Sequence, residues 1–517
     1  MYIGDWLGRR ARLTPDKVAL LDTGDGGRRI TYAEWYARQN QTANFFREEL
    51  GIVRGDRVAV LASNSTAYLD TWFALGVLGG IMQNLNWRLA VPELERVLAD
   101  AAPVALLYSH EFQDQVNALR ARLPSVRKFV AIEAPAGTDD LAFGRRDGYS
   151  TAPPPAVELG WDDPWVLCYT GGTTGLPKGA VLTHGAMTAN SVNTVMSWGL
   201  TPEDVVPLIS PLFHTGGLNV FTLPLVHIGG TTVVCKGWDT EQMYDLIAGH
   251  VITLFFAVPT MFVMMQAHPR WQSADFSHLK YVINGGAPCP LPVFENWWSK
   301  GVIFKTGYGL TEAGPNTFWL PHTDVRRKPG SVGFPLFHVD VKIVDPVSEE
   351  DAGPDEVGEL LIRGPHVCAG YWNDPEATAA AIRPTRAEPG GPSWLHTGDL
   401  ARCDPEGYYY IVGRSKDMII SGGENVYPAE VESAICSHPA VEAACLIGVP
   451  DEKWGEVGRA IVVLKPGGKL AYPALQEHLA GRLARYKIPK SLVVVEALPV
   501  TAAGKIDKQR LSQQYGT

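Results

Sequence analysis

A glycine- and threonine-rich segment, YTGGTTGLPKG at residues 169–179, has the composition of an anion-binding loop. Glycines let backbone N–H groups approach a phosphate closely, threonine hydroxyls add donors, and a lysine supplies mobile positive charge. Because Gly179 follows the lysine, the spacing is not that of a Walker A loop. The alternative interpretation is a flexible surface loop. The residues expected at a phosphate are Thr170, Gly171, Gly172, Thr173, Thr174, Gly175 and Lys178, with the Thr174 hydroxyl also near a metal ion.

A second candidate segment, YGLTE at residues 308–312, places a hydroxyl beside a carboxylate. Such a pair could hold phosphate and Mg²⁺, which takes few protein carboxylates and shares its coordination shell with phosphate oxygens. The alternative is an ordinary turn with an exposed glutamate. Upstream, small residues follow the apolar run 280–283, and Gly286, Ala287 and Pro288 leave room for a flat ligand, unless they form a plain turn.

These segments together resemble the acyl-adenylate-forming superfamily, which includes acyl-CoA synthetases, firefly luciferases and the adenylation domains of peptide synthetases. They occur in the order of that family, and the resemblance extends from Ile30-Thr31-Tyr32 to Gly504-Lys505-Ile506. The chain is most similar to the acyl-CoA synthetase branch. The resemblance implies that ATP activates a carboxylic acid as an acyl-adenylate with release of pyrophosphate, and that coenzyme A then accepts the acyl group and AMP is released.

The resemblance also implies roles for individual residues. Tyr308 would pack on the adenine beside Gly309, Thr311 would contact the α-phosphate and take part in catalysis, and Glu312 would bind Mg²⁺. A later segment, ISGGENVYP, resembles the lining of the thioester-forming tunnel, where glycines permit close approach by the pantetheine arm. The residues expected at CoA are Ser421, Gly422, Gly423 and Glu424.

The ribose contacts and the catalytic lysine follow from the same resemblance. The motif WLHTGDL at residues 394–400 supplies Asp399, whose carboxylate can accept hydrogen bonds from both ribose hydroxyls, and Arg414 is the second contact. Lys416 matches the hinge of the family, and Lys505 matches its catalytic lysine of adenylation. Taken alone, each of these residues would most often be a surface charge.

The segment PLFHTGG at residues 211–217 bears on the substrate. It lacks the aspartate with which peptide-synthetase domains pair an amine, and the resemblance implies that His214 lies near the reacting carboxylate. The alternative for His214 is a hydrogen-bonded core histidine. Apolar residues that could form the acyl pocket, although such residues are more often plain core, are Val258, Met261, Phe262, Phe318 and Trp319.

An apolar pocket suits a fatty or aromatic acid better than acetate. We therefore expect a medium- or long-chain fatty acid, with an aromatic acid of the benzoate or hydroxycinnamate type as the alternative. Two further alternatives have the same fold: an enzyme with another acceptor, such as an acyl-AMP ligase that loads a carrier protein or a luciferase-like oxidase, and a non-catalytic acyl- or nucleotide-binding protein. Retention of the predicted lysines and carboxylates argues against the last of these.

Short strand-like and helix-like stretches alternate up to about residue 400, which favours α/β layers with largely parallel sheets. We expect strands at 58–61, 104–108 and 128–132, a helix at 68–79, and buried core at 251–265. After residue 413 the pattern changes to a small α+β domain, with helices at 430–437 and 474–483 and strands at 441–449 and 460–464. The sequence thus predicts an α/β protein with a large N-terminal domain of layered subdomains, 1–413, and a small mobile α+β domain, 414–517, with its hinge near Lys416.

The 517 residues carry a net charge of −10, which argues mildly against a nucleic-acid partner. Seven scattered cysteines without a CxxC pair predict neither a disulfide framework nor a zinc site. No signal peptide or membrane-spanning run is expected, so the predicted location is cytoplasmic. The expected ligands are the acid, ATP, Mg²⁺ and CoA, and a homodimer is one expected assembly.

Overall fold

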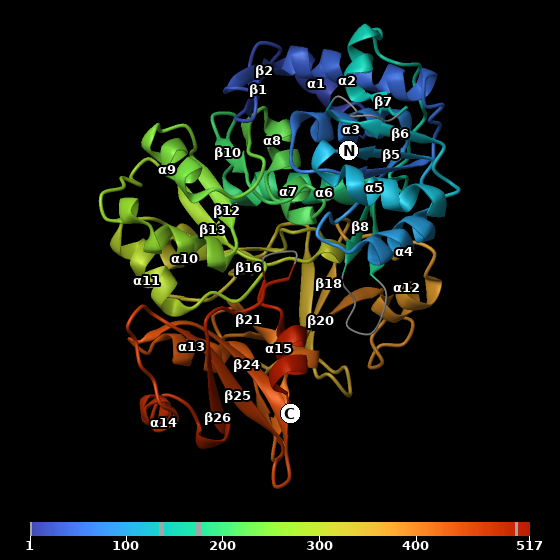
Figure 1. The fold of residues 1–517 in the computed structure, drawn as a ribbon. Helices are drawn as coiled ribbons and strands as arrows, with labels where there is room; N and C mark the ends of the chain where they lie inside the picture. The colour runs from blue at the N-terminus through green and yellow to red at the C-terminus, as the bar shows by residue number, and fades with distance from the viewer. Residues whose placement is uncertain (1–2, 134–138, 171–176, 502–504, 517) are drawn as a thin grey trace.

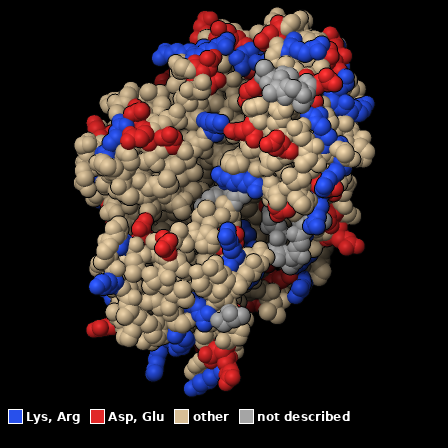
Figure 2. Space-filling view, in the orientation of Figure 1, with Lys and Arg blue, Asp and Glu red and all other residues tan. Residues whose placement is uncertain are grey.

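The computed structural model describes residues 3–133, 139–170, 177–501 and 505–516. Figure 1 shows a large lobe of layered sheets and helices, and a smaller lobe formed by the C-terminal elements below it. Figure 2 shows acidic and basic side chains interspersed on the described part of one face, so charge of one sign does not dominate that face. None of the helices in the described ranges is long and apolar enough to cross a membrane.

One layer of the large lobe is a seven-stranded sheet in the order β7-β6-β5-β3-β4-β8-β9. Its strands run parallel except β8 and β9, which pair antiparallel on either side of residues 171–176. The predicted strands at 58–61, 104–108 and 128–132 are confirmed as β3, β5 and β6. The strands are β3 (Arg57–Leu61), β4 (Ile81–Asn84), β5 (Ala105–Tyr108), β6 (Lys128–Ala131), β7 (Leu141–Ala142), β8 (Pro164–Thr170) and β9 (Lys178–Thr183), with helices α3 (Thr66–Leu78), α4 (Val91–Ala101) and α5 (Gln113–Leu119).

A second layer is the four-stranded sheet β10-β11-β1-β2. Helix α2 starts with a capping box, in which Glu34 N–H donates to Thr31 Oγ1 and Thr31 N–H donates to Glu34 Oε2. The elements are β1 (Val18–Asp22), β2 (Arg28–Thr31), β10 (Val205–Leu208), β11 (Thr231–Val234), α1 (Trp6–Leu13), α2 (Tyr32–Glu48), α6 (His184–Trp198), α7 (Thr215–Asn219) and α8 (Thr222–Ile228).

The third layer is the parallel sheet β12-β13-β14 with its helices. The apolar run 251–265, predicted as buried core, forms β12 and most of α10; its buried residues pack in an aromatic core, whereas Thr260 and Met264 are exposed. The elements are β12 (Leu254–Ala257), β13 (Tyr281–Asn284), β14 (Phe304–Thr306), α9 (Thr240–Ala248), α10 (Pro259–Ala267) and α11 (Leu291–Ser299).

An antiparallel sheet completes the large lobe and leads into the small one. Strand β21 pairs with β20 and ends at Arg414, and a short 3₁₀ helix at Ser415–Asp417 follows it. Strands β15 (Phe318–Trp319) and β16 (Phe334–Pro335) pair as a separate two-stranded sheet. The elements of the larger sheet are β17 (Asp340–Val344), β18 (Gly358–Arg363), β19 (Ile382–Arg383), β20 (Trp394–Cys403) and β21 (Tyr409–Arg414), with helix α12 (Pro375–Ala381).

The small lobe has its own five-stranded sheet and its own core, as the predicted α+β domain requires. The helix predicted at 474–483 is α14, which ends at Leu479 because Ala480 is extended and Gly481 has a φ of +78°. The elements are β22 (Ile419–Ser421), β23 (Glu424–Val426), α13 (Pro428–Cys436), β24 (Val441–Asp451), β25 (Gly455–Leu464), α14 (Tyr472–Leu479), β26 (Ser491–Val495) and α15 (Lys508–Tyr515).

Candidate active site

One side of the candidate site is built around the carboxylate of Asp399. Pairing of β20 with β21 sets Asp399 opposite Arg414, whose Nε lies 3.1 Å from Oδ1. The other oxygen, Oδ2, accepts a hydrogen bond of 2.6 Å from the Tyr308 hydroxyl. Burial raises the pKa of Asp399, which is 5% exposed, while the Arg414 charge lowers it. The structure thus brings together three residues that the sequence predicted around adenosine.

The loop before Thr311 depends on backbone approaches that only glycine permits. A Cβ on Gly309 would lie 2.3 Å from the backbone of Pro315, and a Cβ on Gly285, at the end of β13, would lie 3.1 Å from the Gly307 carbonyl. Gly286 has a φ of +79°, a conformation that favours glycine. The predicted Ala287 and Pro288 follow it at the surface. The segment Gly285–Pro288, at the end of β13, is therefore open to a ligand on one face and closely packed on the other.

Lys505, which belongs to the small lobe, lies next to Gly286 at the end of β13. Its Cε lies 3.5 Å from the position that a Cβ would take on Gly286, and Val258 Cγ1 lies 3.7 Å from the same position. Burial lowers the pKa of the Lys505 ammonium, the Arg414 charge lowers it further, and Asp399 opposes both. A lysine of one lobe is therefore part of the site of the other.

The predicted metal residue, Glu312, lies where β8 meets two loops. Its Oε1 accepts hydrogen bonds from Thr170 Oγ1 at 3.3 Å and from the Tyr371 hydroxyl at 2.9 Å. The Nζ of Lys178 lies 5.3 Å from the centre of the Tyr371 ring. Tyr371 was missed by sequence reasoning, because no local pattern marks it.

This donor set fits Mg²⁺. One carboxylate and one hydroxyl lie together at the end of β8, and a Mg²⁺ ion commonly takes only one or two protein ligands when phosphate oxygens complete its shell. Within the described ranges, no group of three or more His, Cys, Asp and Glu side chains could hold a metal ion. The predicted phosphate residues Gly171, Gly172, Thr173, Thr174 and Gly175 lie outside the described residues.

His214 precedes α7 and is held by the backbone. Its Nδ1 accepts a hydrogen bond of 3.2 Å from Gly216 N–H, which leaves Nε2 to carry the proton of the neutral ring. Burial, together with the nearby Lys505 charge, lowers the pKa of His214 to about 4. The imidazole is therefore neutral near pH 7 and offers a donor close to Lys505.

Phe256 on β12 is a second residue that sequence reasoning missed. The position of a Cβ on Gly216 would be 3.6 Å from its ring, and that on Gly285 would be 2.9 Å. The Phe256 ring therefore lies between Gly216 and Gly285. Gly216 contacts His214, and Gly285 precedes Gly286, which lies next to Lys505. The sequence signal was the alternation in LFFA, which sends Phe255 into the core and Phe256 to the opposite face.

The predicted acyl wall is only partly assembled at this place. Val258 adjoins Gly286, and Met261 packs partly buried against the aromatic core. Phe262 is 0% exposed and packs against Phe255, Trp297 and Phe304 in that core. The helical phase of α10 directs it there.

The other two predicted wall residues come from β15. Phe318 is 1% exposed and packs against Tyr308 and Tyr409. The Trp319 ring covers the Lys305 ammonium, whose pKa burial lowers to about 6. The Phe318 ring therefore supports Tyr308 from the core, whereas Trp319 packs against Trp198 and Tyr281.

The predicted CoA residues form the β22–β23 hairpin of the small lobe. Its turn has φ values of +63° at Gly422 and +88° at Gly423, and Glu424 is exposed, while Ser421 is 5% exposed. Gly422 N–H donates to the Trp454 carbonyl at 2.8 Å, and the indole lies against the glycine. The exposed glycine turn leaves its backbone accessible to a ligand.

Comparisons with known proteins agree with this geometry. A family model described as AMP-binding enzyme matches residues 7–372, and one described as AMP-binding enzyme C-terminal domain matches residues 430–505. The feruloyl-CoA synthase of Amycolatopsis sp. is 42% identical, with 99% of both chains covered. The indoleacetate–CoA ligase of Aromatoleum aromaticum is 38% identical, and the long-chain-fatty-acid–CoA ligase FadD13 of Mycobacterium tuberculosis is 35% identical. Each match covers 99% of this chain and 98% of the relative.

A solved structure matches both lobes at once. ATP-bound MatB from Rhodopseudomonas palustris gives a TM-score of 0.89 at 30% identity, covering 100% of this chain and 99% of that one, whereas its apo form gives 0.81. A site of this kind that receives a lysine from a second domain is the arrangement of an adenylate-forming enzyme. The chain belongs to the AMP-binding enzyme family, and within it this protein is an ATP-dependent ligase of the acyl-CoA synthetase class.

Proposed function

We propose that this enzyme joins an aryl-substituted carboxylic acid to CoA through an acyl-adenylate. The observation that carries the reaction is the position of Lys505, which reaches Gly286 from the small lobe while Tyr308 and Arg414 hold Asp399 beside it. Two observations favour an aryl acid over the fatty acid expected from sequence. The relatives named for feruloyl and indoleacetate substrates are 42% and 38% identical, against 35% for the long-chain ligase. The Phe256 ring between two glycines also offers a flat surface for stacking.

In the first half-reaction the acid carboxylate attacks the α-phosphorus of ATP, a new P–O bond forms, and pyrophosphate leaves. Both reactants are anions, so the step needs positive charge rather than a protein nucleophile. Lys505 would hold the carboxylate against the α-phosphate, with Thr311 at the same phosphate. The neutral His214 would donate Nε2–H to the acid without a further charge.

The remaining phosphate residues would stabilise the leaving pyrophosphate. Lys178 would approach the β- and γ-phosphates, and Thr170 would orient Glu312. A Mg²⁺ ion bound at Glu312 would neutralise phosphate charge. The roles predicted for Thr174 and the glycines of its loop stay predictions.

In the second half-reaction the CoA thiol attacks the carbonyl carbon of the adenylate, and AMP leaves. Lys505 and the Ser421–Glu424 hairpin belong to the same small lobe and cannot both face one carbonyl. We therefore propose that the lobe rotates about Lys416 between the two steps. A homodimer and a cytoplasmic location stay predictions.

The test is pyrophosphate release and thioester formation with ATP and Mg²⁺, with and without CoA. The acids are benzoate, cinnamate, 4-hydroxycinnamate, indoleacetate, octanoate and palmitate, and Lys505→Ala is assayed in parallel. We expect CoA-dependent thioester from the aryl acids, and pyrophosphate release reduced about a hundredfold or more in the variant. Turnover of octanoate and palmitate alone would restore the fatty-acid assignment. Pyrophosphate without thioester would point to another acceptor, such as a carrier protein.

A further inference from the structure

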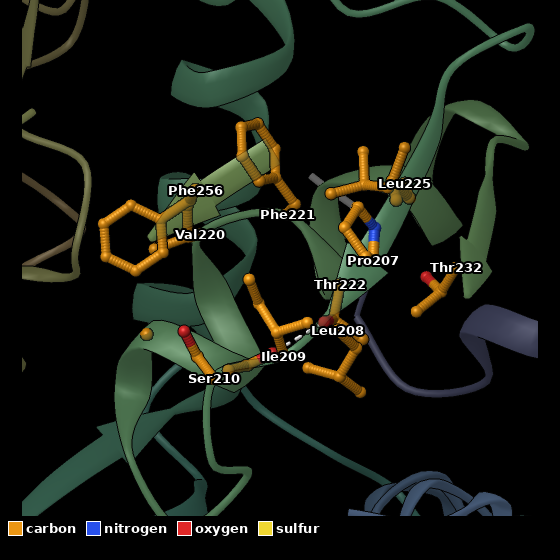
Figure 3. A pocket seen from close by; sticks show the side chains of 13 residues that line it. Pro207, Leu208, Ile209, Ser210, Val220, Phe221, Thr222, Leu225, Thr232 and Phe256 are labelled. Carbon is orange, nitrogen blue, oxygen red and sulfur yellow. Dashed lines mark hydrogen bonds between the residues drawn. The ribbon is translucent and has the colours of Figure 1, made fainter. Parts of the chain in front are cut away.

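A small cavity lies directly behind Gly216 and Phe256, between β10, β11 and the α7–α8 segment. Its volume is about 20 Å³, which is room for roughly one water-sized group. Figure 3 shows Ser210, Val220 and Phe256 at one end and Thr232 at the other. The cavity is therefore too small for a ring or a chain, but it can take a single substituent.

The exposure of the lining residues shows which end is open. Ser210, Gly216 and Phe256 are partly exposed, whereas Thr232 is 3% exposed. The open end adjoins the site already described, because a Cβ on Gly216 would lie 3.4 Å from His214 Nδ1. A group that enters the cavity from the side of His214 would therefore meet Thr232 at the closed end.

Three hydroxyls lie among otherwise apolar and backbone groups in the described lining. Thr222 Oγ1 donates to the Gly217 carbonyl at 2.6 Å. The hydroxyls of Ser210 and Thr232 form no hydrogen bond with any residue in the described ranges. In the described ranges neither oxygen is among the fully enclosed polar atoms without a partner, so both hydroxyls can be reached from the cavity. Both hydroxyls are therefore available to bond to a group in the cavity.

The preceding residue on β11 provides a contrast. Thr231 is 8% exposed, and its hydroxyl donates to the Val18 carbonyl at 2.6 Å. Its side chain points to the opposite face of the strand from that of Thr232. On the two faces of β11, one threonine hydroxyl is thus bonded to the protein, and the other belongs to the lining of the cavity.

Resting on the proposed aryl-acid ligase activity, we propose that Thr232 and Ser210 bind a small neutral polar substituent, such as a ring hydroxyl, at the end of the acid opposite its carboxylate. Each hydroxyl can donate one hydrogen bond and accept others, which matches a group that does both. The described lining carries no charged side chain, so a neutral group is favoured over an ionised one. Beyond this substituent the closed end at Thr232 leaves no room for an extended chain.

The experiment measures kcat/KM for thioester formation with 4-hydroxycinnamate and with cinnamate, a pair that differs by one hydroxyl. The wild-type enzyme should prefer the hydroxylated acid by about tenfold. Thr232→Val should reduce this preference to about twofold or less, by slowing 4-hydroxycinnamate and leaving cinnamate unchanged or faster. Ser210→Ala should reduce it by a smaller factor.

Two variants on the same strand guard against a merely structural effect. Thr232→Ser keeps the hydroxyl and should retain most of the preference, and Thr231→Val removes the protein-bonded hydroxyl and should leave the ratio at the wild-type value. An unchanged ratio in Thr232→Val, or an equal loss with both acids, would overturn this inference while the ligase assignment stands. Pyrophosphate from none of the aryl acids would instead overturn the proposed function on which it rests.

Discussion

The two sides of the active site are built by opposite means. The side on which we propose that the ribose binds, the ribose side, is held by functional groups, since Asp399 is fixed by an ion pair with Arg414 and a hydrogen bond from Tyr308. The acyl side is shaped by missing side chains, because Gly216 and Gly285 leave the space in which the Phe256 ring stands. The first kind of site fails when a charge is removed, and the second fails when an atom is added.

The largest effect is expected on the ribose side, from Asp399→Asn. The change removes the charge that pairs with Arg414 and one acceptor for a ribose hydroxyl, and it leaves the side-chain volume nearly unchanged. Hydrogen bonds to a charged group are the strong ones, so kcat/KM for ATP should fall about a hundredfold, with a smaller change in KM for the acid. The measurement is pyrophosphate release at varied ATP.

An exposed pair of the same type provides the control. Arg363 lies 2.7 Å from Asp340, with side chains 39% and 61% exposed, so Asp340→Asn should change neither activity nor stability appreciably. If Asp399→Asn and Asp340→Asn gave the same small effect, the ribose side would not depend on its buried charge.

A smaller effect is expected on the acyl side, from Gly285→Ala. The added Cβ would lie 2.9 Å from the Phe256 ring and 3.1 Å from the Gly307 carbonyl, which is backbone and yields less readily than a side chain. We expect kcat/KM for the acid to fall about tenfold, and KM for ATP to change by less than about twofold. Gly237→Ala is the control, since a Cβ there meets nothing within 4 Å. An equal loss for ATP and acid would show that the two sides are not separable.

The same contrast explains how far the sequence predicted the site. Asp399, Arg414 and Lys505 carry charge within ordered motifs, and the structure brings them together. Tyr371 contacts Glu312 only because the loop after β18 folds back onto β9, and no spacing of residues encodes that contact. Phe256 was not predicted as a site residue. Alternate side chains of a buried strand point to opposite faces, but the sequence does not show which face meets a ligand.

The limits on the fold were of a related kind. Strands such as β3 and β5 were predictable because runs of buried apolar residues specify them locally. Phe262 and Phe318 were assigned to the pocket from residue type alone, and the phase of α10 and the pairing of β15 decided otherwise. Helix α14 ends before Gly481, which has a positive φ. The predicted helix ran on to residue 483 because the apolar pattern was given more weight than this glycine.

The last predicted effect is on stability rather than on activity, and its dependence on pH distinguishes the charged side from the neutral one. Burial and the Lys505 charge lower the pKa of His214 from 6.5 to about 4. Between these values the unfolded chain binds more protons at this residue than the folded chain. Stability from His214 is therefore fully present above about pH 6.5 and is lost as the pH falls toward 4, by at most about 3 kcal/mol. The measurement is thermal unfolding of the wild type and His214→Phe across this range, and the difference in Tm should shift against the wild type as the pH falls. A difference in Tm that is constant with pH would mean that the imidazole has the same pKa in the folded and the unfolded chain. The acyl side would then not be a neutral surface.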